Sequence, residues 1–537
     1  MKTDTLRTVI GFALIIVILI GWQMLFRPKP KPTVPAPVAA AETAAPVDTA
    51  RPAPEPDTVR PALAAAPAEI LPETTLVLEN DLLRLEFTSL GGAIRSAYLK
   101  RYSAELVPDG LTLFGLGVIT ATGHVAPDRL ATVATGDDTS VTFTWTDGGA
   151  SVSRTCVLGA GYEIAERVTV TGEVGLEHDL SAGLALTEKD PKEALTHYHY
   201  YAHNGKKLRQ IQAGKLKKPD AAADSLTWFG LKSKYFLAAV VADGLVLDSA
   251  CAAALPDQRV GCAAVVRRAP ADSRYRLFLA PLEYNLLRSY KLGFENVIGL
   301  GWTRPIALGM LWLLNALFSV LRNWGWAIVV FSILMKAAFY PLTRTQTRQM
   351  RQMQLLQPKL NELKTRYKGD AQKLNAETMQ LYKLYKINPL SGCLPLVVQL
   401  PIFWALYAVL RNMIELRGAE FVLWLKDLSQ PDALFGHLPA GLPFIGGAAF
   451  GALPVLMGVS FIAQNLITSA DKRNWAMTII FPVFITLIFL NMPSGLQLYW
   501  FMYNILSIVE SLIGIKGGSL WKTKGRSEAT EAIPGPK

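Results

Sequence analysis

Residues 324–342 read WGWAIVVFSILMKAAFYPL, an apolar run that is long enough to span a membrane as a helix and carries one charged side chain, Lys336. About 20 predominantly apolar residues cross the hydrocarbon core of a bilayer. Lys336 lies seven residues before Thr343, the expected cytoplasmic boundary, and therefore about 10 Å deep at 1.5 Å per residue. A charge at that depth is costly in lipid and usually faces protein or water, so Lys336 is a candidate functional residue.

The composition agrees with a membrane protein. Of 537 residues, 51% are hydrophobic and 18% charged, and the mean hydropathy is +0.25. This balance is too apolar for a water-soluble chain of that length and predicts a multispanning membrane protein. The net charge of +11 is compatible with nucleic acid, anionic lipid or acidic clients as partners, and its distribution along the chain has to decide.

The first 73 residues predict an anchor and a linker. In residues 1–27, Lys2 and Arg7 precede the apolar run 9–26, which we interpret as an uncleaved transmembrane anchor with a cytoplasmic N-terminus. A cleaved signal peptide is the alternative, but no small-x-small cleavage site follows, and the run ends in the bulky residues Trp22, Met24, Leu25 and Phe26. Residues 28–73 are rich in Pro and Ala and predict a disordered linker.

Residues 74–285 have the period of strands. Segments such as TLVLENDLLRLEF (75–87) and YEIAERVTVTGEV (162–174) alternate apolar and polar residues. This pattern predicts a large antiparallel β-sandwich without a membrane span. Cys251 and Cys262 flank a turn here, and they form either a disulfide or two unpaired thiols.

The remaining chain predicts helical spans near 324–342, 395–414, 450–467, 475–491 and 493–512. Ten Lys and Arg oppose three Asp and Glu between Leu342 and Leu394, which places this segment in the cytoplasm by the positive-inside rule. An even number of spans must then separate it from the N-terminus, so the apolar stretch 301–322 is expected to lie in the outer interface. We therefore predict six spans, both termini cytoplasmic, an external β domain and a basic cytoplasmic tail over 516–537.

The cytoplasmic segment 344–386 predicts an antiparallel helical hairpin. Its first helix carries an apolar seam with spacings of 3, 4, 3 and 4 residues, made of Met353, Leu356, Leu360, Leu363 and Tyr367. After a break at 368–370, Asp370 is expected to cap a second helix that carries Leu374, Leu381 and Leu384. The alternative is a pair of helices lying on the lipid surface.

Lys336 has no obvious acidic partner in the sequence. The spans at 395–414, 450–467 and 475–491 contain no Asp or Glu, and Glu510 is expected near the cytoplasmic end of the last span, as a peripheral partner at best. The spans supply neutral polar residues instead: Ser332, Gln399, Gln464, Asn465, Thr468, Gln497, Tyr499 and Asn504. This pattern indicates a water-filled inner cavity with an uncompensated positive charge, unless the lysine stem lifts the ammonium to the headgroups.

Several long segments resemble the YidC/Oxa family of membrane protein insertases. They are 323–343 (NWGWAIVVFSILMKAAFYPLT), 356–367 (LQPKLNELKTRY), 388–407 (NPLSGCLPLVVQLPIFWALY) and 492–500 (MPSGLQLYW). Segments 78–99 (LENDLLRLEFTSLGGAIRSAYL) and 228–241 (WFGLKSKYFLAAVV) resemble the periplasmic domain of the Gram-negative type. The expected fold is thus a five-helix insertase core with an N-terminal anchor helix and a periplasmic β-sandwich.

The resemblance implies a function. Family members insert inner-membrane proteins and help them fold, alone or with the Sec translocon (SecYEG), through a positively charged hydrophilic groove that opens to cytoplasm and lipid. Implied partners are nascent clients, lipids and, at the cytoplasmic hairpin, the ribosome and targeting factors, with no direct nucleic-acid binding. Lys336 falls where the family usually has arginine, and lysine keeps the charge but loses the planar fork. The predicted client-binding groove consists of Lys336, Ser332, Gln399, Gln464, Tyr499, Trp500 and Asn504. The polar members have helix–helix packing as their alternative role.

Other functions have weaker support. An intramembrane enzyme needs a Ser/His, Asp/Asp or HExxH set in the spans, and none is present in the sequence, so no catalysis and no cofactor are expected. His197 and His199 share a strand face in HYHYYAH (197–203), which admits a metal site but fits a solvated strand or loop better. A channel or transporter and a sugar-binding β-sandwich remain alternatives.

Overall fold

The computed structural model describes residues 73–121, 123–125, 133–147, 150–188, 191–222, 225–385, 394–442, 445–468 and 476–520. The predicted anchor (1–27), all but the last residue of the predicted linker and the end of the predicted tail lie outside the described residues. The chain separates into a β unit, within Met1–Ser233 and Ala238–Leu279, and a helical unit, Lys234–Leu237 and Ala280–Lys537.

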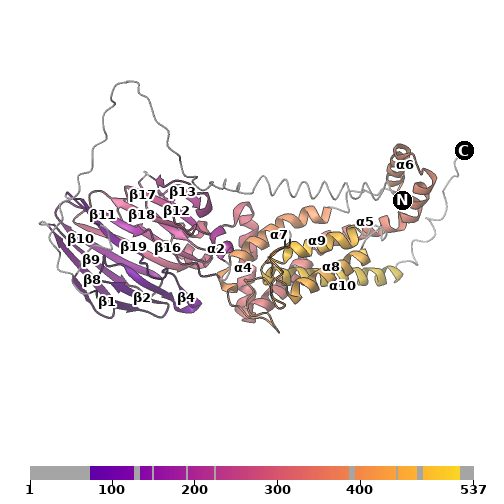
Figure 1. Ribbon diagram of the computed structural model, residues 1–537. Coiled ribbons are helices and arrows are strands. Elements are labelled where there is room, and N and C mark those ends of the chain that lie inside the picture. The colour runs from indigo at the N-terminus through magenta and orange to yellow at the C-terminus, as the bar shows by residue number, and fades with distance from the viewer. Residues whose placement is uncertain are drawn as a thin grey trace, which may run out of the picture. The chain divides into compact units, whose positions relative to one another are not determined.

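The described strands of the β unit form three sheets (Figure 1). One sheet contains β1 (Thr75–Glu79), β2 (Leu83–Thr88), β3 (Ile94–Leu99) and β4 (Ala104–Glu105). The largest runs β13 (Leu208–Gln212), β12 (His199–His203), β15 (Trp228–Lys232), β16 (Phe236–Ala242), β19 (Asp272–Pro281), β10 (Glu163–Thr171), β9 (Ala150–Leu158), β8 (Ser140–Asp147) and β7 (Val133–Gly136). The third runs β14 (Asp220–Ala222), β17 (Ser249–Ala254), β18 (Val260–Val266), β11 (Gly175–Leu180), β5 (Gly115–Thr120) and β6 (Gly123–Val125). A short helix, α2 (Pro191–Thr196), precedes β12.

Strand β10 shows why these segments form a sandwich. Ile164, Glu166, Val168 and Val170 are buried, and the residues between them face outward. It pairs antiparallel with β9 and β19, so an alternating sequence buries one face of each strand. The predicted antiparallel β-sandwich is confirmed.

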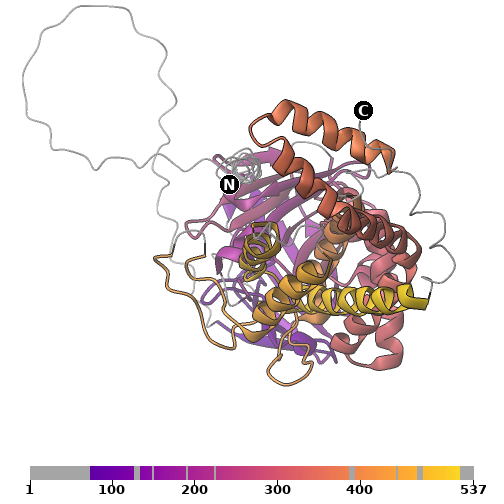
Figure 2. The same cartoon turned by 90° about the vertical axis from the view of Figure 1, so that its right-hand side faces the viewer.

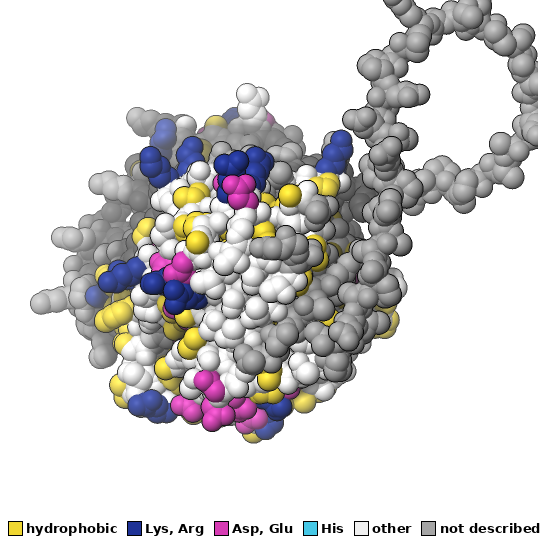
Figure 3. Space-filling view, turned by 90° about the vertical axis from the view of Figure 1, so that its left-hand side faces the viewer, with side chains coloured by type: hydrophobic (Ala, Val, Ile, Leu, Met, Phe, Trp, Pro, Cys, Tyr) yellow, Lys and Arg dark blue, Asp and Glu magenta, His cyan; other side chains and the backbone are white. Residues whose placement is uncertain are grey.

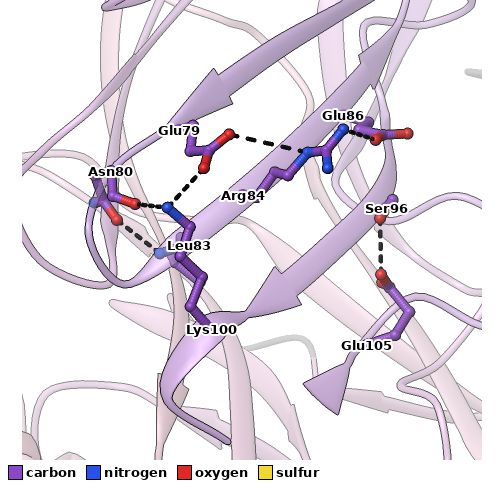
Figure 4. Close-up of polar contacts among 8 residues, drawn as sticks. All are labelled: Glu79, Asn80, Leu83, Arg84, Glu86, Ser96, Lys100 and Glu105. Carbon is purple, nitrogen blue, oxygen red and sulfur yellow. Dashed lines mark hydrogen bonds and ion pairs between the residues drawn. The ribbon is translucent and has the colours of Figure 1, made fainter. Parts of the chain in front are cut away.

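The turn between β1 and β2 is organised by Asn80. Its side-chain oxygen accepts hydrogen bonds from the backbone N–H groups of Leu82 (2.8 Å) and Leu83 (2.6 Å), and its amide donates to the carbonyls of Gly159 and Gly161. Figure 4 shows this turn with exposed polar contacts around it, among them Lys100 against Glu79 (2.7 Å). The amide of Asn80 thus ties the β1–β2 turn to the β9–β10 turn.

A buried ion pair joins the sheets. The Arg154 guanidinium on β9 donates from Nε to Glu166 Oε1 (2.6 Å) and from one terminal nitrogen to the carbonyls of Gly92 (3.0 Å) and Phe114 (2.8 Å). Gly92 precedes β3 and Phe114 precedes β5, so one side chain connects all three sheets. His178 on β11 lies 3.8 Å from Glu166, and burial lowers its pKa to about 4. It is therefore neutral at pH 7.

The cysteine and histidine alternatives can now be judged. Cys251 pairs with Ala263 and Cys262 with Ala252 on β17 and β18; Cys251 is exposed, Cys262 is buried, and both thiols are free. The two side chains leave opposite faces of one sheet, which excludes a disulfide between them in this fold. His199 bonds the carbonyl of His197 (2.8 Å) through Nδ1, and the described residues hold no group of three potential metal ligands.

Charges on the β unit are mixed. Where described residues are visible in Figure 3, basic and acidic side chains lie in small groups among hydrophobic and neutral ones, and several groups contain both signs. These described residues show no continuous field of one sign, whereas nucleic-acid-binding surfaces are typically basic.

The helical unit contains α3 (Tyr284–Ser289), α4 (Arg304–Leu321), α5 (Trp324–Arg366), α6 (Ala371–Leu384), α7 (Leu394–Asn412), α8 (Ala452–Thr468), α9 (Phe481–Phe489) and α10 (Ser494–Leu520). Within the described residues, Gly301–Leu321, Trp324–Pro341 and Ser494–Ile513 are long and apolar enough to span a membrane, and Ala452–Ile467 and Thr478–Phe489 are shorter apolar helices. Length and composition do not separate a span from an interfacial helix, so the outer-interface position of α4 stays a prediction.

The first predicted span and the first hairpin arm form one helix. α5 runs without interruption past Pro341 and Pro358. α6 lies against the end of α5 (Figure 2), and the Asp370 carboxylate caps α6 by accepting from the backbone N–H of Lys373 (2.9 Å). The predicted cap is confirmed.

Asp432 organises the loop between α7 and α8. One carboxylate oxygen accepts from Trp424 Nε1 (3.0 Å) and from the backbone N–H of Leu453 (2.7 Å), at the start of α8, and the other from the N–H of Leu434 (3.1 Å). A Cβ at Gly451 would lie 2.2 Å from the carboxylate carbon, so only glycine fits beside it. Asp432 therefore fixes the loop to the N-terminal end of α8, which its carboxylate caps.

Candidate functional site

The Lys336 ammonium is held by three side chains of α10. Its Nζ donates to Ser507 Oγ at 2.8 Å and lies 2.8 Å from Glu510 Oε2. It also lies 4.6 Å from the centre of the Tyr503 ring. A hydroxyl, a carboxylate and an aromatic face all stabilise a cation.

Helical spacing brings these groups together. Residues 503, 507 and 510 lie on one face of α10 at steps of four and three. On α5, Thr343 lies two turns beyond Lys336 and donates to the second oxygen of Glu510 at 3.1 Å. The Lys336 and Glu510 side chains are 11% and 16% exposed, so the pair is largely shielded.

The expectation of an uncompensated lysine is wrong: Glu510 is its counterion. The sequence predicted Glu510 near the end of a span at 493–512, but α10 continues to Leu520. Glu510 therefore lies within α10, ten residues before its end, and the long side chain of Lys336 on α5 reaches its carboxylate.

Gln399 and Tyr499 are brought together near this site. The two side chains are hydrogen-bonded to each other, and Tyr499 is buried between Phe331 (6.1 Å between ring centres) and Tyr503 (6.2 Å). A continuous polar and aromatic path therefore leads from Gln399 to the Tyr503 ring under Lys336. These positions were predicted from the resemblance, and Tyr503 was not.

Ser332 and Trp500 make packing contacts. The Ser332 hydroxyl is buried and donates to the carbonyl of Ile328 (2.7 Å) within its own helix. Trp500 is half-buried with its ring 5.5 Å from Phe403, 5.2 Å from Phe489 and 6.4 Å from Tyr503. It thus joins α7, α9 and α10.

Asn504 and Gln464 lie on another side of the bundle. Asn504 is buried and donates to the Met457 carbonyl (3.3 Å) and to Ser460 Oγ (3.1 Å), which ties α10 to α8. Gln464 is half-buried one turn beyond Ser460. Asn504 thus contacts α8, the helix that carries Gln464, and the groove roles of both residues stay predictions.

The hairpin seam is buried at its middle. Leu356 and Leu360 are buried, whereas Met353, Leu363 and Tyr367 are half-buried. Lys359 donates to the Tyr385 hydroxyl, and Lys373 lies 5.5 Å from the Tyr367 ring centre, so contacts cross between the arms. Leu384, which the sequence assigned to the second hairpin helix, is 76% exposed at the last position of α6.

Sequence reasoning gave Glu510 too small a role and missed Ser507, Tyr503 and Thr343. The signal was present in YNILSIVE (503–510), where Tyr503, Ser507 and Glu510 share one helical face. An apolar helix with three such residues on one face predicts a buried partner for them.

Comparison with known proteins agrees with this architecture. A family model described as YidC periplasmic domain matches residues 75–313, and one described as 60Kd inner membrane protein matches 316–518. The membrane protein insertase YidC of Pelobacter propionicus is 31% identical over 94% of this chain and 98% of its own. That of Geobacter sulfurreducens is 31% identical over 94% and 97%.

Solved structures add only weak likenesses. A crystal structure titled active YidC insertase, with the first transmembrane domain resolved, is 19% identical, covers 81% of this chain and 92% of its own, and has a TM-score of 0.39. A galactose mutarotase-like protein from Lactobacillus casei is 9% identical, covers 38% of this chain and 100% of its own, and has a TM-score of 0.31. These scores carry no argument, whereas the two family models and the relatives span nearly all of the sequence. The chain therefore belongs to the YidC family of membrane protein insertases.

Proposed function

We propose that this insertase receives the acidic or polar tail of a client at Lys336, in a hydrophilic groove that opens to the cytoplasm and to lipid. The observation that carries the proposal is the set of polar groups around Lys336 Nζ: Ser507, Glu510 and, through Glu510, Thr343. These groups lie between two helices that are otherwise apolar enough to span a membrane. Polar side chains at such depth usually serve function.

The site lowers the cost of moving a client tail into the membrane. A carboxylate in an apolar medium is strongly destabilised unless it is paired. Lys336 supplies the opposite charge, and Ser507 and Tyr503 supply neutral polar neighbours. The apolar segment of the client then leaves sideways into lipid, and its burial drives insertion at about 25 cal/mol per Å².

Other parts of the chain have proposed roles that fit this one. The hairpin seam (Met353, Leu356, Leu360, Leu363 and Tyr367) contacts clients, the ribosome or targeting factors in the cytoplasm, and the Sec translocon is a partner in the membrane. Gln399, Tyr499 and Trp500 form the wall beside Lys336. Both termini are cytoplasmic, and α4 lies in the outer interface.

A rescue experiment tests the role of Lys336. Cells depleted of their own insertase are supplied with this chain or with K336R, K336Q or K336E, and insertion of a small acidic-tailed client is measured. K336R should restore insertion and K336E should fail, because it places two carboxylates together. A K383Q variant, which removes an exposed cation of α6 away from the contacts between the arms, controls for net charge. Equal rescue by K336E and K336R would reject the role.

A channel or transporter remains the second candidate, and one observation favours it. Intramembrane Lys–Glu pairs are typical of ion or proton pathways, and Lys336 and Glu510 form such a pair. The full chain in vesicles should insert an acidic-tailed client without ion leakage. Ion flux that disappears in K336Q, together with no client insertion, would favour the transporter.

A further inference from the structure

Glu510 occupies the position that a client carboxylate would take. Its Oε2 lies 2.8 Å from Lys336 Nζ, and the other contacts of that ammonium described above, Ser507 Oγ and the Tyr503 ring, are neutral. An ammonium has three donor hydrogens, of which Ser507 and Glu510 use two. An incoming anion must therefore share the cation with Glu510 or displace it.

Displacement is favoured over sharing. Two carboxylates on one ammonium repel each other, and in a partly buried site this repulsion is poorly screened. An arginine could hold two carboxylates on its planar fork, but the lysine of this chain offers a single point charge. The Glu510 carboxylate at Lys336 therefore weakens the binding of a client carboxylate to the same ammonium.

Glu510 has a second partner to which it can remain bound. Its other oxygen accepts from the Thr343 hydroxyl at 3.1 Å. Thr343 lies seven residues beyond Lys336, about 10 Å further along α5. When another anion takes Lys336, Glu510 keeps this hydrogen bond and is not left as an unsatisfied carboxylate.

We infer that Glu510 is a specificity-determining residue: it competes with clients for Lys336, and only tails with enough acidic groups displace it. The inference rests on the proposed function of Lys336. Several acidic residues in one tail raise the effective concentration of carboxylate at the site, whereas a neutral tail has no means to exchange with Glu510. The internal competitor therefore sets a threshold of client charge.

The test uses the full chain in vesicles of phosphatidylethanolamine and phosphatidylglycerol. A small client carries a photocrosslinker in its tail, with either Asp residues or Asn at the same positions, and crosslinking to α5 and α10 is measured below saturation. E510Q should raise the yield for the acidic tail by about tenfold, the factor that corresponds to about 1.4 kcal/mol of lost competition. The yield for the amide tail should stay within about twofold.

A second variant should change the crosslinking yield of the acidic tail in the opposite direction. T343V removes the alternative partner of Glu510 without a change of charge, so it should lower the yield for the acidic tail several-fold. E362Q, an exposed glutamate in the hairpin arm of α5, makes the same charge change as E510Q away from the pair and should alter neither yield.

The outcomes separate the two ideas. If E510Q and T343V lower both yields alike, Glu510 only holds the helices together and the inference is overturned. No change in E510Q overturns it as well. If K336Q keeps the preference for the acidic tail, the proposed role of Lys336 fails first, whatever E510Q does.

Discussion

Lys336 on α5 and Glu510 on α10 form an ion pair at 2.8 Å between two helices that are long and apolar enough to span a membrane. The pair is shielded but not sealed, with side chains 11% and 16% exposed. A cation with a counterion costs less to hold in a membrane than a single charge does. The pair therefore lowers the cost of holding the cation between the two helices.

The Lys336–Glu510 ion pair should contribute to the thermal stability of the helical unit. E510A leaves the ammonium without its counterion, and we expect it to lower the thermal midpoint of the helical unit in detergent more than the double variant K336M/E510A does. A partly exposed pair should couple by about 1 kcal/mol or more. Additive losses would mean that the two side chains do not interact in the folded chain.

Arg154 should be far more important for stability than a matched exposed arginine. R154M leaves Glu166 buried without its partner and removes the bonds to Gly92 and Phe114, which should cost about 3–5 kcal/mol. The control is R167M on the adjacent strand, because the Arg167–Asp272 pair is exposed and its loss should change the stability little. Thermal unfolding of the β unit, followed by circular dichroism in the full chain, measures both. Equal shifts would contradict the role of Arg154.

The β unit should lose stability in acid through His178. Burial lowers its pKa to about 4 in the folded chain, below the usual value of 6.5, so the unfolded chain binds more protons between these values. Stability from this group is full above pH 6.5 and falls as the pH drops towards 4, by roughly 3 kcal/mol. Part of the fall should remain in H178Q, because burial also lowers the pKa of His199 to about 4. An unchanged pH profile in H178Q would exclude His178 as a cause.

Thiol labelling should distinguish the cysteines of the β unit. Cys251 is exposed and should react with a maleimide in the folded chain, with or without a reductant. Cys156 and Cys262 are buried, and burial raises the pKa of the Cys156 thiol to about 12, so both should react only after unfolding. Reductant-dependent labelling of Cys251 would indicate a disulfide that this fold does not allow.

Periodicity predicted the elements well, because it reflects burial on one face. The alternation in β10 predicted a half-buried strand, and Asp370 before an apolar period predicted a helix start. The same alternation puts Glu166 on the apolar face of β10. A carboxylate in that position predicts a buried basic partner, which the structure shows to be Arg154. Long motifs in fixed order predicted the insertase family and with it a protein that is not an enzyme; both predictions are confirmed by the relatives.

The partner of Lys336 could not be predicted in the same way. Sequence gives the position of a residue along its helix, but the rotation of the helix and its neighbours come from packing. Glu510 was judged from its distance to the end of a span, and both the true end of α10 and its packing against α5 were needed to place it beside Lys336. Leu384 shows that a regular apolar spacing does not guarantee burial, because this residue is exposed where α6 ends.

Access of water and client to the Lys336 site can be measured with one cysteine. S507C in a chain whose own four cysteines are replaced by serine places a thiol where the Ser507 hydroxyl contacts Lys336. Ser507 is buried beside the ion pair, so labelling at this position reports the proposed opening of the groove to cytoplasmic water. We predict that a membrane-impermeant maleimide added on the cytoplasmic side labels this thiol, and that an acidic-tailed client protects it more than an amide-tailed one. No labelling, or equal protection by both tails, would contradict a water-exposed site that receives the client at Lys336.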